Sequence, residues 1–246
     1  MNTSLLRTFS RYATLNILGM ISLSCYILAD TFFIAQKLGA TGLAALNLSI
    51  PVYSIIHGLG IMIAIGGATR FSILRSQQEE GRARAVFSTV FRGGLVIGLL
   101  FLLLGLVGSG FLASLLGADP STRPLTKTYL TTILIFAPFF ITNNVIIAFV
   151  RNDDDPRLAM MAMLVGSFSN IVLDYVFLFS FDMGMFGAAL ATCLAPIISL
   201  GTMAPHFMKK GTRLVMFHDK PVWGLLPDVF ALGSSALIAE LSSAVV

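Results

Sequence analysis

The chain is divided into seven long apolar stretches, and this pattern limits its possible folds more than any other feature of the sequence. Most of the stretches reach the roughly 20 residues that a helix needs to cross a hydrocarbon layer. Only 11% of the residues are charged, whereas a soluble domain usually carries about 25%. The sequence therefore predicts an all-α, polytopic membrane protein. The stretches cover residues 13–36, 43–69, 86–116, 125–150, 158–181, 184–207 and 226–246.

The stretches form one complete group and the start of another. Residues 1–207 contain six of them, residues 208–225 form a polar connection, and residues 226–246 begin a further helix that has no polar cap. We therefore expect a six-helix transmembrane lobe, a cytoplasmic inter-lobe loop and the truncated start of a second lobe, which together form the N-terminal portion of a longer protein. The seventh helix, separated from its own lobe, is expected to have no packing partner.

The basic residues predict the orientation of the helices. With a cytoplasmic N-terminus, only Lys37, Arg123 and Lys127 of the 16 lysines and arginines lie in outer segments. Because basic loops remain on the cytoplasmic side, the sequence predicts a multi-pass protein of the plasma (inner) membrane with its N-terminus inside. The basic residues are scattered over several loops, so the net charge of +4 does not indicate a face that binds nucleic acid.

Three carboxylates interrupt apolar helical stretches. Asp30, Asp174 and Glu240 lie far from the polar segments that contain the other acidic residues. An ionisable side chain in hydrocarbon costs roughly 2.5–3.5 kcal/mol on insertion scales, so its presence is a functional hypothesis. Carboxylates that face a cavity inside a helical bundle can bind and release a proton or a cation, which indicates an ion-coupled transporter.

The fifth stretch places an amide and a carboxylate on one helical face. Asn170 and Asp174 are four positions apart in the sequence and therefore lie one turn apart on a helix. Their oxygens are hard ligands that suit Na⁺, or a proton held between groups. A structural hydrogen-bonded pair between helices is the alternative. Asn143, Asn144 and Thr192 are further polar residues within the spans, although such residues commonly tie helices together.

Other motifs have simpler interpretations. Cys25 and Cys193 show no metal-binding spacing and are expected to be buried thiols. His57 is expected to be a buried neutral histidine with a hydrogen-bond partner. The acidic run at 153–155 lies between two arginines and is expected to be a salt-bridged turn. Pro51, Pro138 and Pro196, within the second, fourth and sixth stretches, are candidate bending points of a moving bundle.

Several ordered segments resemble one family, the MATE (multidrug and toxic compound extrusion) transporters. Residues 30–52, which read DTFFIAQKLGATGLAALNLSIPV, are similar to the first helix and loop of that family. Asp154 departs from the family pattern because a glycine is usual at that position of the fourth loop. The other similar segments are residues 66–70, 144–160, 170–174, 187–192 and 233–243.

The resemblance implies an antiporter of twelve helices in two six-helix lobes, which exports drugs or metabolites in exchange for Na⁺ or H⁺. It implies no enzyme activity and no cofactor besides the coupling ion. Its partners would be a small-molecule substrate, which is a drug, a metabolite or another amphipathic or cationic compound, membrane lipid and the missing C-terminal lobe. The resemblance places the cation site at Asp30, Asn170, Asp174 and Thr192, with the first three as Na⁺ ligands, and the substrate cavity at Asn143, Asn144 and Glu240.

Three alternatives remain at this point. A lipid-linked oligosaccharide flippase of the same superfamily would need embedded arginine or lysine, and the sequence places none in helices 1, 2, 4, 5 or 6. An intramembrane aspartyl enzyme would need a YD or GxGD motif, which neither Asp30 nor Asp174 has. No phosphate-binding glycine loop or hydrolase motif occurs either. The third alternative is a nonfunctional fragment of an exporter gene.

Overall fold

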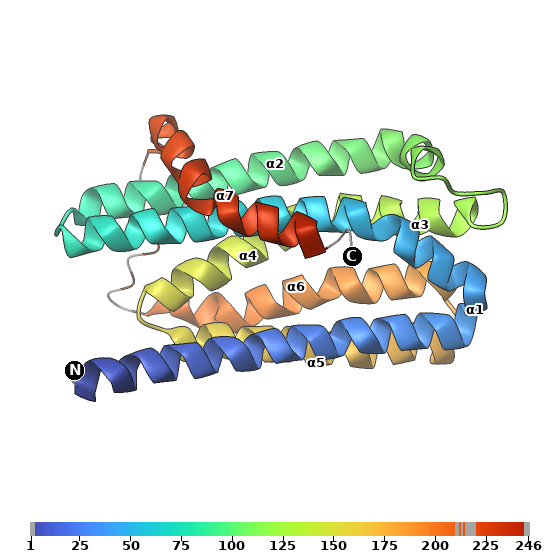
Figure 1. Ribbon diagram of the computed structural model, residues 1–246, viewed down its shortest axis with the longest axis horizontal. Coiled ribbons are helices and arrows are strands. Elements are labelled where there is room, and N and C mark those ends of the chain that lie inside the picture. The colour runs from blue at the N-terminus through green and yellow to red at the C-terminus, as the bar shows by residue number, and fades with distance from the viewer. Residues whose placement is uncertain (1–2, 210–211, 213, 215–219, 244–246) are drawn as a thin grey trace.

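The protein is a bundle of long helices (Figure 1). The computed structural model describes residues 3–209, 212, 214 and 220–243, and this part of the chain contains helices and no strand. The all-α prediction is confirmed. The elements are α1 (Thr3–Ser76), α2 (Glu80–Leu115), α3 (Arg123–Ile135), α4 (Ala137–Asn152), α5 (Pro156–Tyr175), the π-helical η1 (Val176–Ser180), α6 (Gly184–Met208), the 3₁₀-helical η2 (Trp223–Leu225) and α7 (Leu226–Ser243).

The first two predicted spans form the two limbs of α1. Gly39 has φ 64° and ψ −158°, a backbone conformation that glycine adopts without steric cost. The chain folds back at this residue (Figure 1), so the break predicted as a short loop is a one-residue kink. We call residues 3–38 the first limb and residues 40–76 the second limb.

The fourth predicted span is a broken helix. Helices α3 and α4 meet at Phe136 with a bend of 49°, and Pro138 lies in the first turn of α4. Because the first amides of a helix have no intrahelical acceptor, proline is tolerated there. The helix thus bends two residues before Pro138, whereas Pro51 and Pro196 lie inside the continuous helices α1 and α6. Helix α2 comes close to Pro138, since a Cβ added to Gly98 would lie 2.5 Å from Pro138 Cα.

Helix α7 has a packing partner, contrary to the sequence prediction. It crosses the second limb of α1 (Figure 1) at two glycines. A Cβ added to Gly66 would lie 1.9 Å from the Val229 carbonyl oxygen, and one added to Gly233 would lie 1.9 Å from the Met62 carbonyl oxygen. Small residues at both sides of the crossing allow the two backbones to touch.

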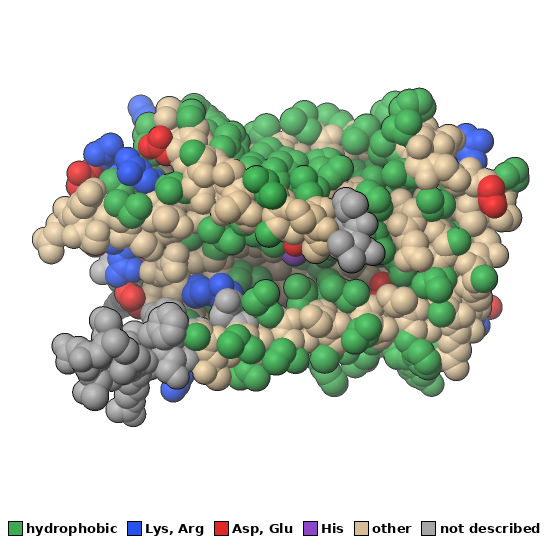
Figure 2. Space-filling model, in the orientation of Figure 1, with side chains coloured by type: hydrophobic (Ala, Val, Ile, Leu, Met, Phe, Trp, Pro, Cys, Tyr) green, Lys and Arg blue, Asp and Glu red, His purple; other side chains and the backbone are tan. Residues whose placement is uncertain are grey.

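The surface agrees with a membrane environment. Figure 2 shows hydrophobic side chains across the middle of the face in view, with charged side chains mainly toward its two ends. Five helices in the described part are long and apolar enough to span a membrane, or six if α3 and α4 count as one span. Because one of these helices is α1, which folds back at Gly39, the chain is a multi-pass membrane protein.

The cysteines differ from each other. Cys193 is buried, as predicted, and its thiol donates to the Thr132 carbonyl oxygen at 3.7 Å. Cys25 is exposed on the first limb, so the prediction that it is buried is wrong. A helix that faces lipid exposes apolar residues on its outer side, and for this reason hydrophobicity alone does not indicate which cysteine lies inside the bundle.

Candidate functional site

Four polar residues predicted from the sequence come together between the first limb, α5 and α6. Asn170 and Asp174 are fully buried on α5, Asp30 is 6% exposed on the first limb, and Thr192 is 5% exposed on α6. We orient the Asn170 amide by its surroundings. Its Nδ2 then donates to Asp174 Oδ2 at 3.1 Å, and its Oδ1 accepts from the Thr192 backbone N–H at 3.2 Å. The i, i+4 spacing on α5 thus places Asn170 and Asp174 in direct contact, and Asn170 also binds the backbone of α6 at Thr192.

This cluster has unmet bonding capacity. Asp30 Oδ1, Asp174 Oδ1 and Thr192 Oγ1 are buried and have no hydrogen-bond partner among the residues that the structure describes. The carboxylates of Asp30 and Asp174 interact electrostatically, and no lysine, arginine or histidine of the described residues forms an ion pair with either. Buried polar atoms are normally satisfied. Unpaired acidic oxygens therefore suit a ligand that brings positive charge, either a proton or a hard cation such as Na⁺.

A transition-metal centre is not indicated. Within the described residues, no group of three or more His, Cys, Asp and Glu side chains could hold a metal ion. The donors at the cluster are carboxylate, amide and hydroxyl oxygens, which are typical ligands of hard cations.

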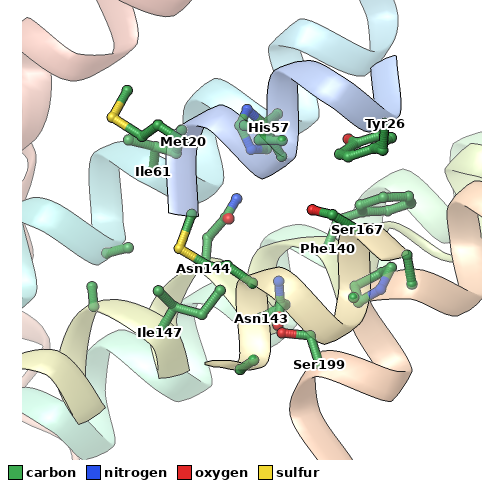
Figure 3. A pocket seen from close by; sticks show the side chains of 18 of the residues that line it. Met20, Tyr26, His57, Ile61, Phe140, Asn143, Asn144, Ile147, Ser167 and Ser199 are labelled. Carbon is green, nitrogen blue, oxygen red and sulfur yellow. The ribbon is translucent and has the colours of Figure 1, made fainter. Parts of the chain in front are cut away.

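A cavity of about 360 Å³ lies beside the cluster, between the two limbs of α1 and helices α4, α5 and α6. Asn143 and Asn144 line it from α4, and Thr192 lines it from α6. Asp30, Asn170 and Asp174 are not among the described residues that line it. Figure 3 shows Tyr26 and His57 on the α1 side of this space and Asn143 and Asn144 on the opposite side. The ion cluster and the cavity are therefore neighbours that share Thr192.

Tyr26 connects the cavity wall to the cluster, and sequence reasoning missed it. It lies one helical turn before Asp30 on the first limb and lines the cavity. Its hydroxyl is 3.3 Å from the Tyr53 hydroxyl on the second limb. The i, i+4 spacing from Tyr26 to Asp30 is the signal that could have identified this residue.

Glu240 lies on α7, and the structure does not place it in the cavity lining. Its Oε1 is 3.1 Å from His57 Nδ1, so it meets the cavity wall through His57, which does line the cavity. The His57 ring stacks on the Tyr53 ring with centroids 5.6 Å apart. The expected hydrogen-bond partner of His57 is therefore a carboxylate 183 positions away in the chain.

Arg151 was assigned from the sequence to a loop, and this assignment is wrong. Helix α4 continues to Asn152, so Arg151 lies in its last turn and lines the cavity. Asn144, Ala148 and Arg151 have the i, i+4, i+7 spacing of one helical face, which is the signal that sequence reasoning overlooked. The cavity therefore has a basic residue at the end of α4, beyond the fourth span that was predicted from the sequence.

The acidic run after α4 is a salt-bridged turn, as predicted. Asp154 pairs with Arg75 at 2.8 Å and has φ 66°, so aspartate here adopts the left-handed conformation for which the family has glycine. Asp155 pairs with Lys209 and accepts from the Leu158 backbone N–H at 3.3 Å. Partial burial opposes ionisation of Asp155, but these hydrogen bonds lower its pKa below the ordinary value.

Asp153 lies deeper in the same turn. It is 7% exposed, and its Oδ2 is 3.0 Å from Nε2 of the buried His206. This contact ties the turn to the end of α6.

Comparisons with known proteins agree with this architecture. Residues 16–176 match the family model MatE. Multidrug export protein MepA of Staphylococcus saprophyticus is 26% identical over 97% of this chain and 53% of its own length. MepA of Staphylococcus aureus strain MRSA252 is 29% identical over 91% of this chain and 50% of its own length. A crystal structure of MATE in the straight conformation has a TM-score of 0.87 at 27% identity, over 95% of this chain and 52% of that one. The chain thus spans about half the length of the relatives that it matches.

Proposed function

Because the chain belongs to the MatE family of transporters, we propose that it forms the N-lobe and the first helix of the second lobe of a cation-coupled antiporter. This antiporter exports drugs or other amphipathic small molecules across the plasma membrane, in exchange for Na⁺ or H⁺. The single observation that carries the proposal is the buried cluster of Asp30, Asn170, Asp174 and Thr192 beside a cavity, with acidic oxygens that have no partner.

The cluster acts as the coupling site in this proposal. Two carboxylates that repel each other in a poorly hydrated environment are stabilised when one positive charge arrives. A proton or Na⁺ therefore binds there and is released when the surroundings change. The Asn170 amide holds Asp174 in place and links α5 to the α6 backbone, so occupancy of the site affects the packing of both helices.

The drug and the ion do not compete for one carboxylate. Asp30 and Asp174 lie outside the cavity lining. A compound in the cavity therefore influences the cluster indirectly, through the residues that lie between the cavity and the cluster. Thr192 is the principal link, because its backbone N–H binds Asn170 and its residue lines the cavity. Coupling therefore operates through Thr192, whose position both ligands affect. It is reciprocal, because a drug that changes the affinity for the ion must be affected by the ion to the same degree.

Transport requires a second lobe that faces this one. Family transporters expose a central site alternately to the two sides of the membrane. The bend at Phe136 between α3 and α4, and the crossing of α7 over the second limb, are places where such a movement could be accommodated. We propose a cytoplasmic N-terminus on the basis of the distribution of basic residues.

The enzyme alternative receives no support. A substrate in the cavity would not touch Asp30 or Asp174, because neither lines it, and the proteins that the chain resembles are transporters. The flippase alternative depends on recognition of an acidic headgroup. Arg151 lines the cavity and is a basic side chain that can bind such a group.

Efflux in proteoliposomes tests the proposal. The full-length protein is reconstituted, and drug export is driven by an imposed Na⁺ or proton gradient. Asp30→Asn and Asp174→Asn are each expected to abolish gradient-driven export while the protein still reconstitutes. Asp228→Asn is the matched control, because its side chain is 57% exposed on α7. Wild-type export rates in both cluster variants would refute the proposed coupling role.

A further inference from the structure

We propose that the cavity recognises an acidic group on its substrate, with Arg151 as the counter-charge and Asn144 and Ser199 as hydrogen-bond donors. The substrate class is then an amphipathic compound that carries a carboxylate or phosphate, and not a purely cationic one. This inference rests on the proposed export function and specifies what the cavity selects.

The charge of the cavity wall is the first argument. Arg151 and His57 line it, and no aspartate or glutamate is among its described lining residues. His57 already has Glu240 as its partner at 3.1 Å. Within the described part of the chain, the hydrogen bond of Arg151 is to a sulfur, Met163 Sδ, at 3.7 Å, which is a weak acceptor. Arg151 is half-buried, so its charged side chain is partly removed from water, and an acidic ligand would supply the counter-charge that the described cavity lining lacks.

Two further donors have no protein partner. Ser199 is 2% exposed on α6, and its Oγ has no hydrogen-bond partner in the described structure. Asn144 Nδ2 is likewise buried and unsatisfied. Both residues line the cavity. A buried donor without an acceptor is destabilising, so these two atoms indicate an acceptor supplied by a ligand. Asn143 Oδ1 also lies in the cavity wall and is a buried acceptor without a donor in the described structure, so the ligand would bring a hydrogen-bond donor as well as its acidic group.

The three donors line one cavity. Asn144 and Arg151 lie on the same face of α4, about two turns apart. Figure 3 shows Asn144 reaching into the space between α1 and α4, and Ser199 beside Asn143 on the adjoining side. Gly60 on the second limb makes room for the amide, because a Cβ there would lie 2.9 Å from Asn144 Nδ2. Rings at Tyr53 and Phe140 supply an apolar wall for the rest of an amphipathic molecule.

The competing explanation is that Arg151 anchors the end of α4 at the membrane surface, as basic residues near helix ends often do. Neighbouring basic residues behave differently. Arg75 binds both Asp154 and the Asn152 carbonyl, and Arg157 is exposed, whereas Arg151 lines the cavity. An anchoring role would not make binding depend on the charge of a ligand, and this difference separates the two explanations.

Binding of a matched dye pair tests the inference. Rhodamine B carries a free carboxylate, and its ethyl ester differs by the loss of that charge. Fluorescence polarisation measures the affinity of each dye for the purified full-length protein in nanodiscs. The wild type is expected to bind the acid about tenfold more tightly than the ester, because a desolvated charge-assisted hydrogen bond contributes on this scale. Arg151→Gln should remove this preference and Arg151→Lys should retain part of it, while the control Arg157→Gln should leave it unchanged.

The outcomes separate this inference from the proposed function. If the wild type binds only the ester, or both dyes equally, the acidic subsite is refuted while export of amphipathic compounds stands. If Arg151→Gln weakens both dyes to the same extent, Arg151 has a structural role and the inference is again refuted. If neither dye binds, the inference fails and the proposed transport of such compounds is contradicted as well. The ratio in the wild type is decisive even if a variant does not fold.

Discussion

Replacement of Gly233 by alanine tests how α7 packs on the second limb of α1. The added Cβ would lie 1.9 Å from the Met62 carbonyl oxygen and 2.8 Å from its carbon. Both are backbone atoms, so no side-chain rotation can relieve the overlap. Contacts below 3.0 Å are essentially never seen for real Cβ atoms, so α7 must move by roughly 1 Å or separate from α1. Overpacking typically costs about 1–3 kcal/mol, and we expect the upper end here.

The same crossing predicts non-additive effects. Gly66→Ala meets the Val229 carbonyl oxygen at 1.9 Å, and one displacement of α7 would relieve both overlaps. The double variant should therefore lose less stability than the two single losses combined. Thermal unfolding of the purified protein, followed by circular dichroism, is the assay. A loss of about 3 kcal/mol corresponds to roughly 6–12 °C for a protein of this size.

Gly201→Ala in α6 is the control, because a Cβ there has open space and alanine favours a helix by about 1 kcal/mol. Unfolding temperatures of Gly66→Ala and Gly233→Ala equal to that of Gly201→Ala would refute the close crossing.

Three further predictions concern topology, the link to α7 and acid stability. Cysteines at Ser121 and Ser76 should be labelled from outside intact cells at the first position alone, and the reverse pattern would invert the proposed orientation. His57→Gln and Glu240→Gln should be coupled by about 1 kcal/mol in a double-mutant cycle of unfolding, since their contact at 3.1 Å is partly exposed, and independent effects would mean that the contact is absent. Asp155 has a lowered pKa, so its contribution to stability is present above the unfolded-state pKa and is lost as the pH falls through the folded-state pKa. Asp155→Asn should therefore flatten the acid side of the stability profile, and an unchanged profile would contradict the assignment.

Local patterns in the sequence predicted the spans and part of the site. Long apolar runs indicated the helices because a bilayer requires them, and the i, i+4 spacing of Asn170 and Asp174 gave their contact directly. The bend near Pro138 was also local, since proline cannot donate a backbone hydrogen bond. The addition of Asp30 and Thr192 to the cluster depended on the resemblance to a family, because no local rule relates residues on separate helices.

Long-range packing and helix ends could not be predicted in this way. The contact between His57 and Glu240 joins residues on α1 and α7, and the packing of α7 depends on backbone contact at Gly66 and Gly233. Arg151 was misassigned because helix boundaries are uncertain by one or two residues, and α4 extends two residues beyond the predicted span, which places Arg151 in the helix and at the cavity. Glu240 was placed in the cavity by resemblance, whereas its orientation is determined by the packing of α7.

A count of the cations that the buried cluster binds tests the central claim most directly. Bound Na⁺ is measured with ²²Na⁺, and bound protons by pH titration, in the same purified preparations of the full-length protein. The claim predicts that the wild type binds one more Na⁺ or one more proton than Asp174→Asn, and that Asp30→Asn shows the same deficit, while Asp228→Asn equals the wild type. The claim would be contradicted if the wild type and both cluster variants bound the same number of Na⁺ ions and also the same number of protons. Asp30 and Asp174 would then be buried structural groups.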